Sequence, residues 1–131
     1  MQSVSSNAVA GAIANISNYS STPVTIGKWI DGSTDVKRVT LNITFSLNES
    51  LTTVQLSNYN INEVVCLDGI ISTVINNTTR FNFNINSMWD WGSGGWKVQW
   101  YINTGDKTMI IQRGNEFYSR TCYGYITIDY V

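Results

Sequence analysis

The feature that most constrains how this chain folds is an alternation of apolar and polar residues with a period of two. Residues 36–47, VKRVTLNITFSL, show it most clearly. Because successive side chains of a strand point to opposite faces of a sheet, the pattern predicts a half-buried antiparallel strand. Its inward positions are Val39, Leu41, Ile43, Phe45 and Leu47, and its outward positions are Arg38, Thr40, Asn42, Thr44 and Ser46.

Three later segments repeat this alternation. In residues 80–86, RFNFNIN, the inward positions are Phe81, Phe83 and Ile85, and the outward positions are Asn82, Asn84 and Asn86. In residues 97–103, KVQWYIN, the inward positions are Val98, Trp100 and Ile102. The final segment places Ile126, Ile128 and Tyr130 on one face. Each pattern predicts a strand, and Trp100 is expected in the core.

Turn signals separate these segments about every ten residues, the spacing typical of an all-β domain. The dipeptide Asp68-Gly69 lies between INEVVCL and IISTVI and predicts a tight hairpin. A second reversal is expected at residues 103–106, NTGD. No helix of crossover length separates the strands, which excludes a parallel sheet. The sequence therefore predicts an all-β domain over residues 21–131, an antiparallel β-sandwich or jelly-roll-like head.

The first twenty residues contain the one segment with helical spacing. Its apolar stripe consists of Val9, Ala12, Ile13 and Ile16. A helix this short is marginal in water without a partner. A polar break that ends at Pro23 separates it from the strands, so we expect residues 1–20 to form a helical stalk that packs against copies of itself. The alternative is a helix that folds back on the sheet.

The distribution of charge excludes two classes of partner. The chain of 131 residues has a net charge of -1, and its Lys and Arg residues are scattered singly. No positive stripe neutralises phosphates, so we expect neither nucleic-acid binding nor attachment to an anionic membrane. No apolar run reaches the roughly 20 residues of a membrane-spanning helix, so no membrane insertion is expected.

The residue types present also limit catalysis. The chain has no histidine, which removes the usual general base and every Ser-His or Cys-His nucleophile. A two-carboxylate glycosidase remains formally open, with Asp90 and Glu116 as the least implausible pair, but nothing in the sequence brings them together. We therefore expect a protein that is not an enzyme and that has no cofactor.

Two further motifs have structural interpretations. Cys66 and Cys122 lie far apart in strand-like runs and are expected as small buried side chains rather than as a disulfide. Residues 31–35, DGSTD, resemble the start of a calcium loop but depart from that motif at its sixth and twelfth positions. No metal site is therefore expected, and Asp31 is predicted to bond its own backbone in a hairpin turn.

Three segments at the two ends of the chain bear on function. They are QSVSSNAVAGAIAN at 2–15, IGKWIDGSTDVKRVT at 26–40 and YGYITIDYV at 123–131. Together they resemble the C-terminal modules of bacteriophage and prophage tail proteins. The resemblance implies a homotrimeric tail-fibre or tail-tip head on a short helical stalk. It also implies assembly in the bacterial cytoplasm, a place on the virion, and adhesion to a bacterial surface glycan.

Residues 87–96, SMWDWGSGGW, concentrate three of the five tryptophans. A flat indole stacks on the apolar face of a pyranose, while Asp and Asn side chains bond its hydroxyl groups. The glycan-binding candidates are Trp89, Asp90, Trp91, Trp96, Asn82, Asn84 and Asn86. The alternative is that two of these tryptophans seal the end of the sandwich.

The resemblance and the tryptophan cluster together predict a non-enzymatic adhesion module of a phage tail that binds a bacterial surface polysaccharide as a homotrimer. Three other functions remain open at this point. The domain can be a structural end that terminates and registers the fibre, a free carbohydrate-binding module, or a weak depolymerase.

Overall fold

The computed structural model describes residues 19–75, 78–86 and 95–131. The predicted helical stripe and three of the glycan candidates, Trp89, Asp90 and Trp91, lie outside these residues. The elements are β1 (Val24–Lys28), β2 (Asp35–Thr44), β3 (Leu51–Gln55), β4 (Val64–Ile75), β5 (Thr79–Asn84), β6 (Val98–Asn103), β7 (Thr108–Arg113), α2 (Asn115–Tyr118) and β8 (Cys122–Tyr130). Within the described ranges no helix is long and apolar enough to cross a membrane.

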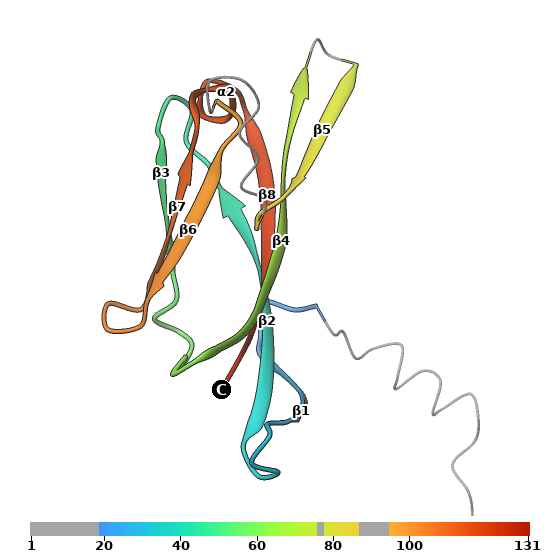
Figure 1. The fold of residues 1–131 in the computed structure, drawn as a ribbon, viewed down its shortest axis with the longest axis vertical. Helices are drawn as coiled ribbons and strands as arrows, with labels where there is room; N and C mark the ends of the chain where they lie inside the picture. Colours follow the sequence, from blue (N-terminus) through green and yellow to red (C-terminus); the bar gives the residue numbers. More distant parts are fainter. Residues whose placement is uncertain (1–18, 76–77, 87–94) are drawn as a thin grey trace, which may run out of the picture.

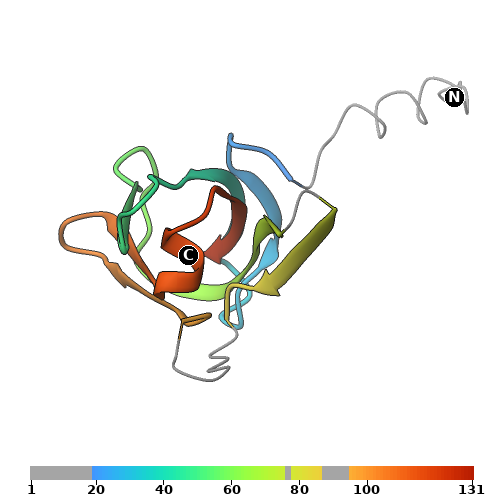
Figure 2. The same cartoon turned by 90° about the horizontal axis from the view of Figure 1, so that it is seen from above.

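The strands form two sheets that face each other (Figures 1 and 2). The five-stranded sheet has the order β1-β2-β8-β4-β5, and the three-stranded sheet has the order β3-β7-β6. Every strand pair is antiparallel. The prediction of an all-β, antiparallel domain is thus confirmed, whereas the predicted helix before it lies outside the described residues.

One hydrophobic core fills the space between the sheets. The five-stranded sheet contributes Val39 and Ile128, and the three-stranded sheet contributes Met109 and Ile111, all fully buried. The alternation predicted for residues 36–47 holds past the end of β2 at Thr44, since Phe45 packs against the core and Ser46 is exposed. Leu47 lies beyond that end and is 56% exposed, so its inward placement was wrong. In and after β5, Phe81, Phe83 and Ile85 pack on the core as predicted.

The hairpin predicted at Asp68-Gly69 is wrong, because β4 continues through this dipeptide from Val64 to Ile75. The Asp68 carboxylate accepts hydrogen bonds from the Gly69 N–H (2.8 Å) and from Asn84 Nδ2 (2.9 Å). The Asp68 carboxylate therefore has hydrogen-bond partners within the sheet. Gly69 lies so close to β8 that a Cβ at this position would be 2.3 Å from the Tyr125 carbonyl oxygen. The glycine thus permits close approach of two strands and does not form a turn.

Two predicted turns are confirmed. At residues 103–106 the Asp106 N–H donates to Asn103 Oδ1 (3.0 Å) between β6 and β7. In the β1–β2 hairpin, Asp31 Oδ1 accepts from the Ser33 and Thr34 N–H groups at 2.9 and 2.8 Å. The Thr34 hydroxyl donates to Asp31 Oδ2. The hydrogen bonds from Thr34 and Ser33 lower the pKa of Asp31 from 3.8 to about 2.

This pKa makes a testable prediction for the hairpin. Because the folded-state pKa is depressed, the contribution of Asp31 to stability is full above pH 3.8 and is lost as the pH falls through about 2. Titration of the Asp31 side-chain carbon by NMR measures the value directly. In Thr34→Val, which lacks the hydroxyl donor, the pKa should rise toward 3.8. A midpoint near 3.8 in the unchanged protein contradicts this assignment.

The two cysteines are free thiols in different environments. Cys122 is buried as predicted, and burial raises the pKa of its thiol. The prediction for Cys66 is wrong, because its side chain is exposed. A register irregularity between Val64 and Cys66, where β4 pairs with β8, places Cys66 beside Asp129 on the outer face of the five-stranded sheet.

Candidate functional site

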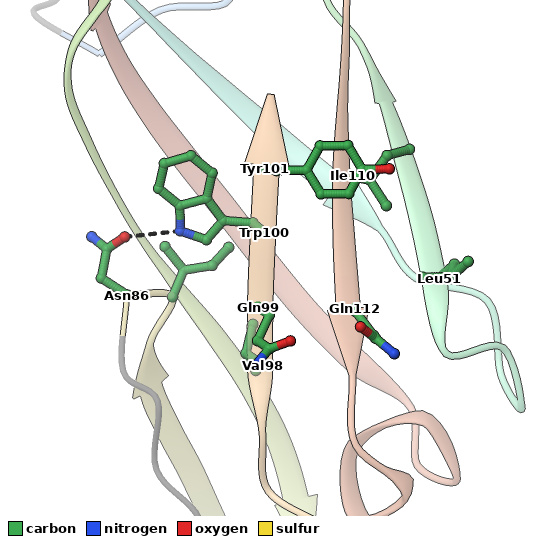
Figure 3. Close-up of a pocket in the computed structure, with 9 residues that line it drawn as sticks. Leu51, Asn86, Val98, Gln99, Trp100, Tyr101, Ile110 and Gln112 are labelled. Atoms are coloured by element: carbon green, nitrogen blue, oxygen red, sulfur yellow. Dashed lines mark hydrogen bonds between the residues drawn. The ribbon is translucent and has the colours of Figure 1, made fainter. Parts of the chain in front are cut away.

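A groove of about 440 Å³ follows β6, the edge strand of the three-stranded sheet. We call it the β6 groove. Its lining residues are Leu51, Ile85, Asn86, Val98, Gln99, Trp100, Tyr101, Ile110 and Gln112 (Figure 3). β6 pairs with β7 along one edge, and its other edge pairs with no strand of the described ranges.

The alternation of β6 places its two aromatic side chains on opposite sides of the strand. Figure 3 shows Trp100 directed toward Asn86, while Tyr101 extends toward Ile110 of β7. Tyr101 is 60% exposed, and Trp100 is half-buried at the margin of the core. Trp100 therefore contributes to the core as predicted, and it also forms a wall of the groove.

The indole of Trp100 is held in place by a short chain of hydrogen bonds. Its Nε1 donates to Asn86 Oδ1 at 2.9 Å. Asn86 in turn donates from Nδ2 to the Leu67 carbonyl oxygen (2.7 Å) and from its backbone N–H to Asn84 Oδ1 (2.8 Å). These bonds fix the ring between β4, β5 and β6, so the indole is oriented before any ligand arrives.

Two glutamines supply hydrogen-bonding groups on the outer side of the sheet. Gln99 of β6 lies opposite Gln112 of β7, which lies opposite Leu51 of β3. The next outward pair along the strands is Tyr101 and Ile110. A primary amide both donates and accepts hydrogen bonds, so this row can bond hydroxyl groups of a ligand that rests on the Tyr101 ring.

The described residues that line the β6 groove include no charged side chain. Within the described ranges, no group of three or more His, Cys, Asp or Glu residues could hold a metal ion. An aromatic surface with neutral amides suits an uncharged, hydroxyl-rich ligand, since a charged group would lack a partner there.

Trp96 does not form the exposed sugar platform predicted for it. Its indole is 9% exposed and stacks on Phe83 at 5.6 Å between ring centroids. Phe81 and Phe117 contact it at 5.7 and 5.1 Å. No ring face is left for a ligand, so Trp96 follows the alternative of a tryptophan that seals the end of the two sheets.

The predicted asparagines divide between two surfaces. All three are exposed, as the alternation predicted. Only Asn86 lines the β6 groove, because the chain turns toward β6 after β5 ends at Asn84. Asn82 pairs with Ser72, and Asn84 pairs with Ile70, both on the outer face of the five-stranded sheet. The predicted set of asparagines is therefore not one site.

The carboxylate pair considered for glycosidase chemistry is not brought together in the described residues. Glu116 lies in α2, where its Oε2 accepts from Arg120 Nη2 at 3.2 Å. Asp90 lies outside the described residues. Glu116 thus forms a surface ion pair with Arg120, four residues later in the chain.

The groove residues that sequence analysis missed are Gln99, Tyr101 and Gln112. The alternation of KVQWYIN does place Gln99 and Tyr101 on the outward face of a strand, but it does not identify their neighbours. Gln112 joins them only through the β6–β7 register.

Comparisons with models of known protein families, with curated proteins and with solved structures find no match. The β6 groove is therefore interpreted from its own chemistry.

Proposed function

We propose that this protein is a non-enzymatic head module of a phage tail fibre or tail tip that binds a neutral glycan of the bacterial surface in the β6 groove. The head is a β-sandwich carried on a short helical stalk formed by residues 1–20. It acts as a homotrimer on the virion, after assembly in the bacterial cytoplasm.

The observation that carries this proposal is the combination of Trp100, Tyr101 and three amide side chains around one uncharged groove. Sugars present apolar ring faces and many hydroxyl groups, and aromatic rings with fixed amides complement both. The hydrogen bond from Trp100 to Asn86 supports the proposal, because an oriented ring loses less entropy on binding. The segments that resemble tail modules supply the biological setting.

The test is binding of the full chain to immobilised host envelope polysaccharide, with neutral and uronic-acid oligosaccharides as soluble competitors. Tyr101→Ala and Gln112→Ala should each weaken binding about tenfold or more, since each removes a contact worth roughly 1.4 kcal/mol. Neutral oligosaccharides should release the protein from the immobilised polysaccharide, and uronic-acid oligosaccharides should not. The melting temperature of Tyr101→Ala should stay within about 2 °C, because the side chain is 60% exposed.

The matched control is Leu47→Ala, a change at an apolar side chain that is 56% exposed and lies outside the groove. It should bind as the unchanged protein does. Tyr101→Phe keeps the ring and should retain most of the affinity. Binding that survives both groove changes, or that only acidic sugars displace, rules out this site.

A further inference from the structure

Several of the most exposed large apolar side chains gather on the outer face of the five-stranded sheet. Tyr19, Tyr123 and Tyr125 are 65%, 57% and 44% exposed. Val74 of β4 shares this face, since it lies two residues after Ser72, which pairs with Tyr123. We call this surface the tyrosine face. The five-stranded sheet that carries this face lies across the core from the three-stranded sheet (Figures 1 and 2).

The strand register arranges the tyrosine face in uncharged rows. One row is Asn42, Tyr125, Ile70 and Asn84, and the next is Thr44, Tyr123, Ser72 and Asn82. At one end of the face, Arg38 and Asp129 neutralise each other through hydrogen bonds of 2.7 and 2.9 Å. Two further charged side chains, Asp68 and Arg80, lie outside these two rows, opposite Thr127 and Val74. The uncharged, tyrosine-containing rows have the composition of the centre of a protein interface.

A hollow of about 500 Å³ lies within this face. Tyr19, Tyr125 and Ile70 line its apolar part. The other lining residues are Thr40, Cys66, Gly69 and Thr127, with the charged side chains of Arg38, Asp68 and Asp129. Such a hollow can receive a side chain of a partner, as the pockets of protein interfaces do.

The start of the described chain lies at the tyrosine face. Tyr19 is the first described residue, and the Arg38 guanidinium lies 5.5 Å from the centre of its ring. The next two residues are anchored, because the Thr40 N–H donates to the Ser20 carbonyl oxygen (2.8 Å) and the Tyr59 hydroxyl donates to that of Ser21 (3.0 Å). The eighteen residues that precede Tyr19 therefore join the head at this face.

We propose that the tyrosine face is the surface on which a second copy of this chain packs in the homotrimer. This inference rests on the proposed trimeric stalk, because copies joined through residues 1–20 bring their points of attachment together around one axis. A threefold ring uses heterologous contacts, so the face of one copy covers a different part of the next. The β6 groove on the opposite sheet then faces outward and stays open to glycan.

The area of the tyrosine face fits this role. Four strands spaced about 4.8 Å apart, with about 3.4 Å per residue along them, give a plan of about 600 Å² over the nine residues of β8. Because side chains project from the sheet, the accessible area is larger than this flat area and approaches the roughly 800 Å² that each partner buries in a stable interface.

The first test uses the unchanged full chain. Light scattering across a dilution series should give a trimer that dissociates on dilution. Labelling of Cys66, which is exposed and lines the hollow, should be about tenfold slower at trimer concentrations than at monomer concentrations. Cys122 is buried and should stay unlabelled at both. A monomer at every concentration, or a trimer in which Cys66 reacts at the same rate, overturns the proposal.

Two lysine substitutions form the matched pair for the second test. Tyr125→Lys on the tyrosine face should raise the concentration of half-dissociation about tenfold or more. The substitution buries one lysine charge at the interface of each of the three copies. Tyr101→Lys in the β6 groove should leave the trimer intact while it weakens glycan binding. If Tyr125→Lys instead abolishes glycan binding by a monomeric protein, the tyrosine face is a glycan site and not an interface. If Tyr101→Lys keeps full binding, the proposed function of the groove fails while this inference stands.

Discussion

Replacement of Arg113 by methionine should lower the free energy of unfolding by about 3 kcal/mol or more, a large effect for a single side chain. Arg113 is 2% exposed at the end of β7. Its Nη2 donates to the carbonyl oxygens of Ser46 (2.8 Å) and Glu49 (2.7 Å), and its Nη1 donates to that of Phe117 (3.4 Å). Methionine fills a similar volume but removes the guanidinium donor from all three carbonyl oxygens. Those of Ser46 and Phe117 keep the Glu49 and Arg120 N–H groups as donors, whereas that of Glu49 loses its partner.

The guanidinium also lies 4.6 Å from the centre of the Phe45 ring. It therefore joins the β2–β3 loop, β7 and α2 at one end of the domain. Within the described ranges no carboxylate forms an ion pair with it. Its charge is stabilised by backbone dipoles and by an aromatic face, and loss of the side chain releases all of these contacts together.

Urea unfolding measures the predicted loss, with Arg80→Met as the matched control. Arg80 is exposed on β5, so the same chemical change there should alter stability by less than about 0.5 kcal/mol. Arg113→Lys should fall between the two, because an ammonium group cannot reach all three carbonyl groups at once. Equal stability of Arg113→Met and Arg80→Met contradicts a structural role for the buried guanidinium.

Sequence alternation predicted most of the fold but not this arginine. Burial of Val39 and Ile128 follows from period two, because each strand segment has one apolar face. Arg113 occupies the same face as Met109 and Ile111. A charged residue at such a position ordinarily marks the end of a buried strand. Its burial depends on carbonyl groups from residues far away in the sequence, which no local pattern reveals.

Among the predicted glycan-binding residues that the structure describes, only Asn86 lines the candidate site. The sequence indicated aromatic rings with asparagines, and the β6 groove has that composition around Asn86. Trp96, however, is buried among phenylalanines that are remote in the chain. Gln99 and Gln112 meet only because β6 pairs with β7 in one register. Sites formed across strands depend on register, which alternation alone does not set.

Replacement of Gly69 by alanine should also destabilise the domain by about 3 kcal/mol or more, through overpacking rather than through lost hydrogen bonds. The added Cβ would lie 2.3 Å from the Tyr125 carbonyl oxygen and 3.1 Å from Ile126 Cα. Both are backbone atoms of β8, a central strand of the five-stranded sheet. Neither can rotate away, so β4 and β8 must separate and weaken the ladder that joins them.

Gly27→Ala is the matched control, because nothing lies within 4 Å of a Cβ built at that position in β1. It should change stability by less than about 0.5 kcal/mol, with a slight gain from the lower entropy of the unfolded chain. Urea unfolding of the two variants measures the difference, because a glycine in close contact with a neighbouring strand has no room for a methyl group. Equal stability of Gly69→Ala and Gly27→Ala would therefore show that β4 and β8 do not approach this closely.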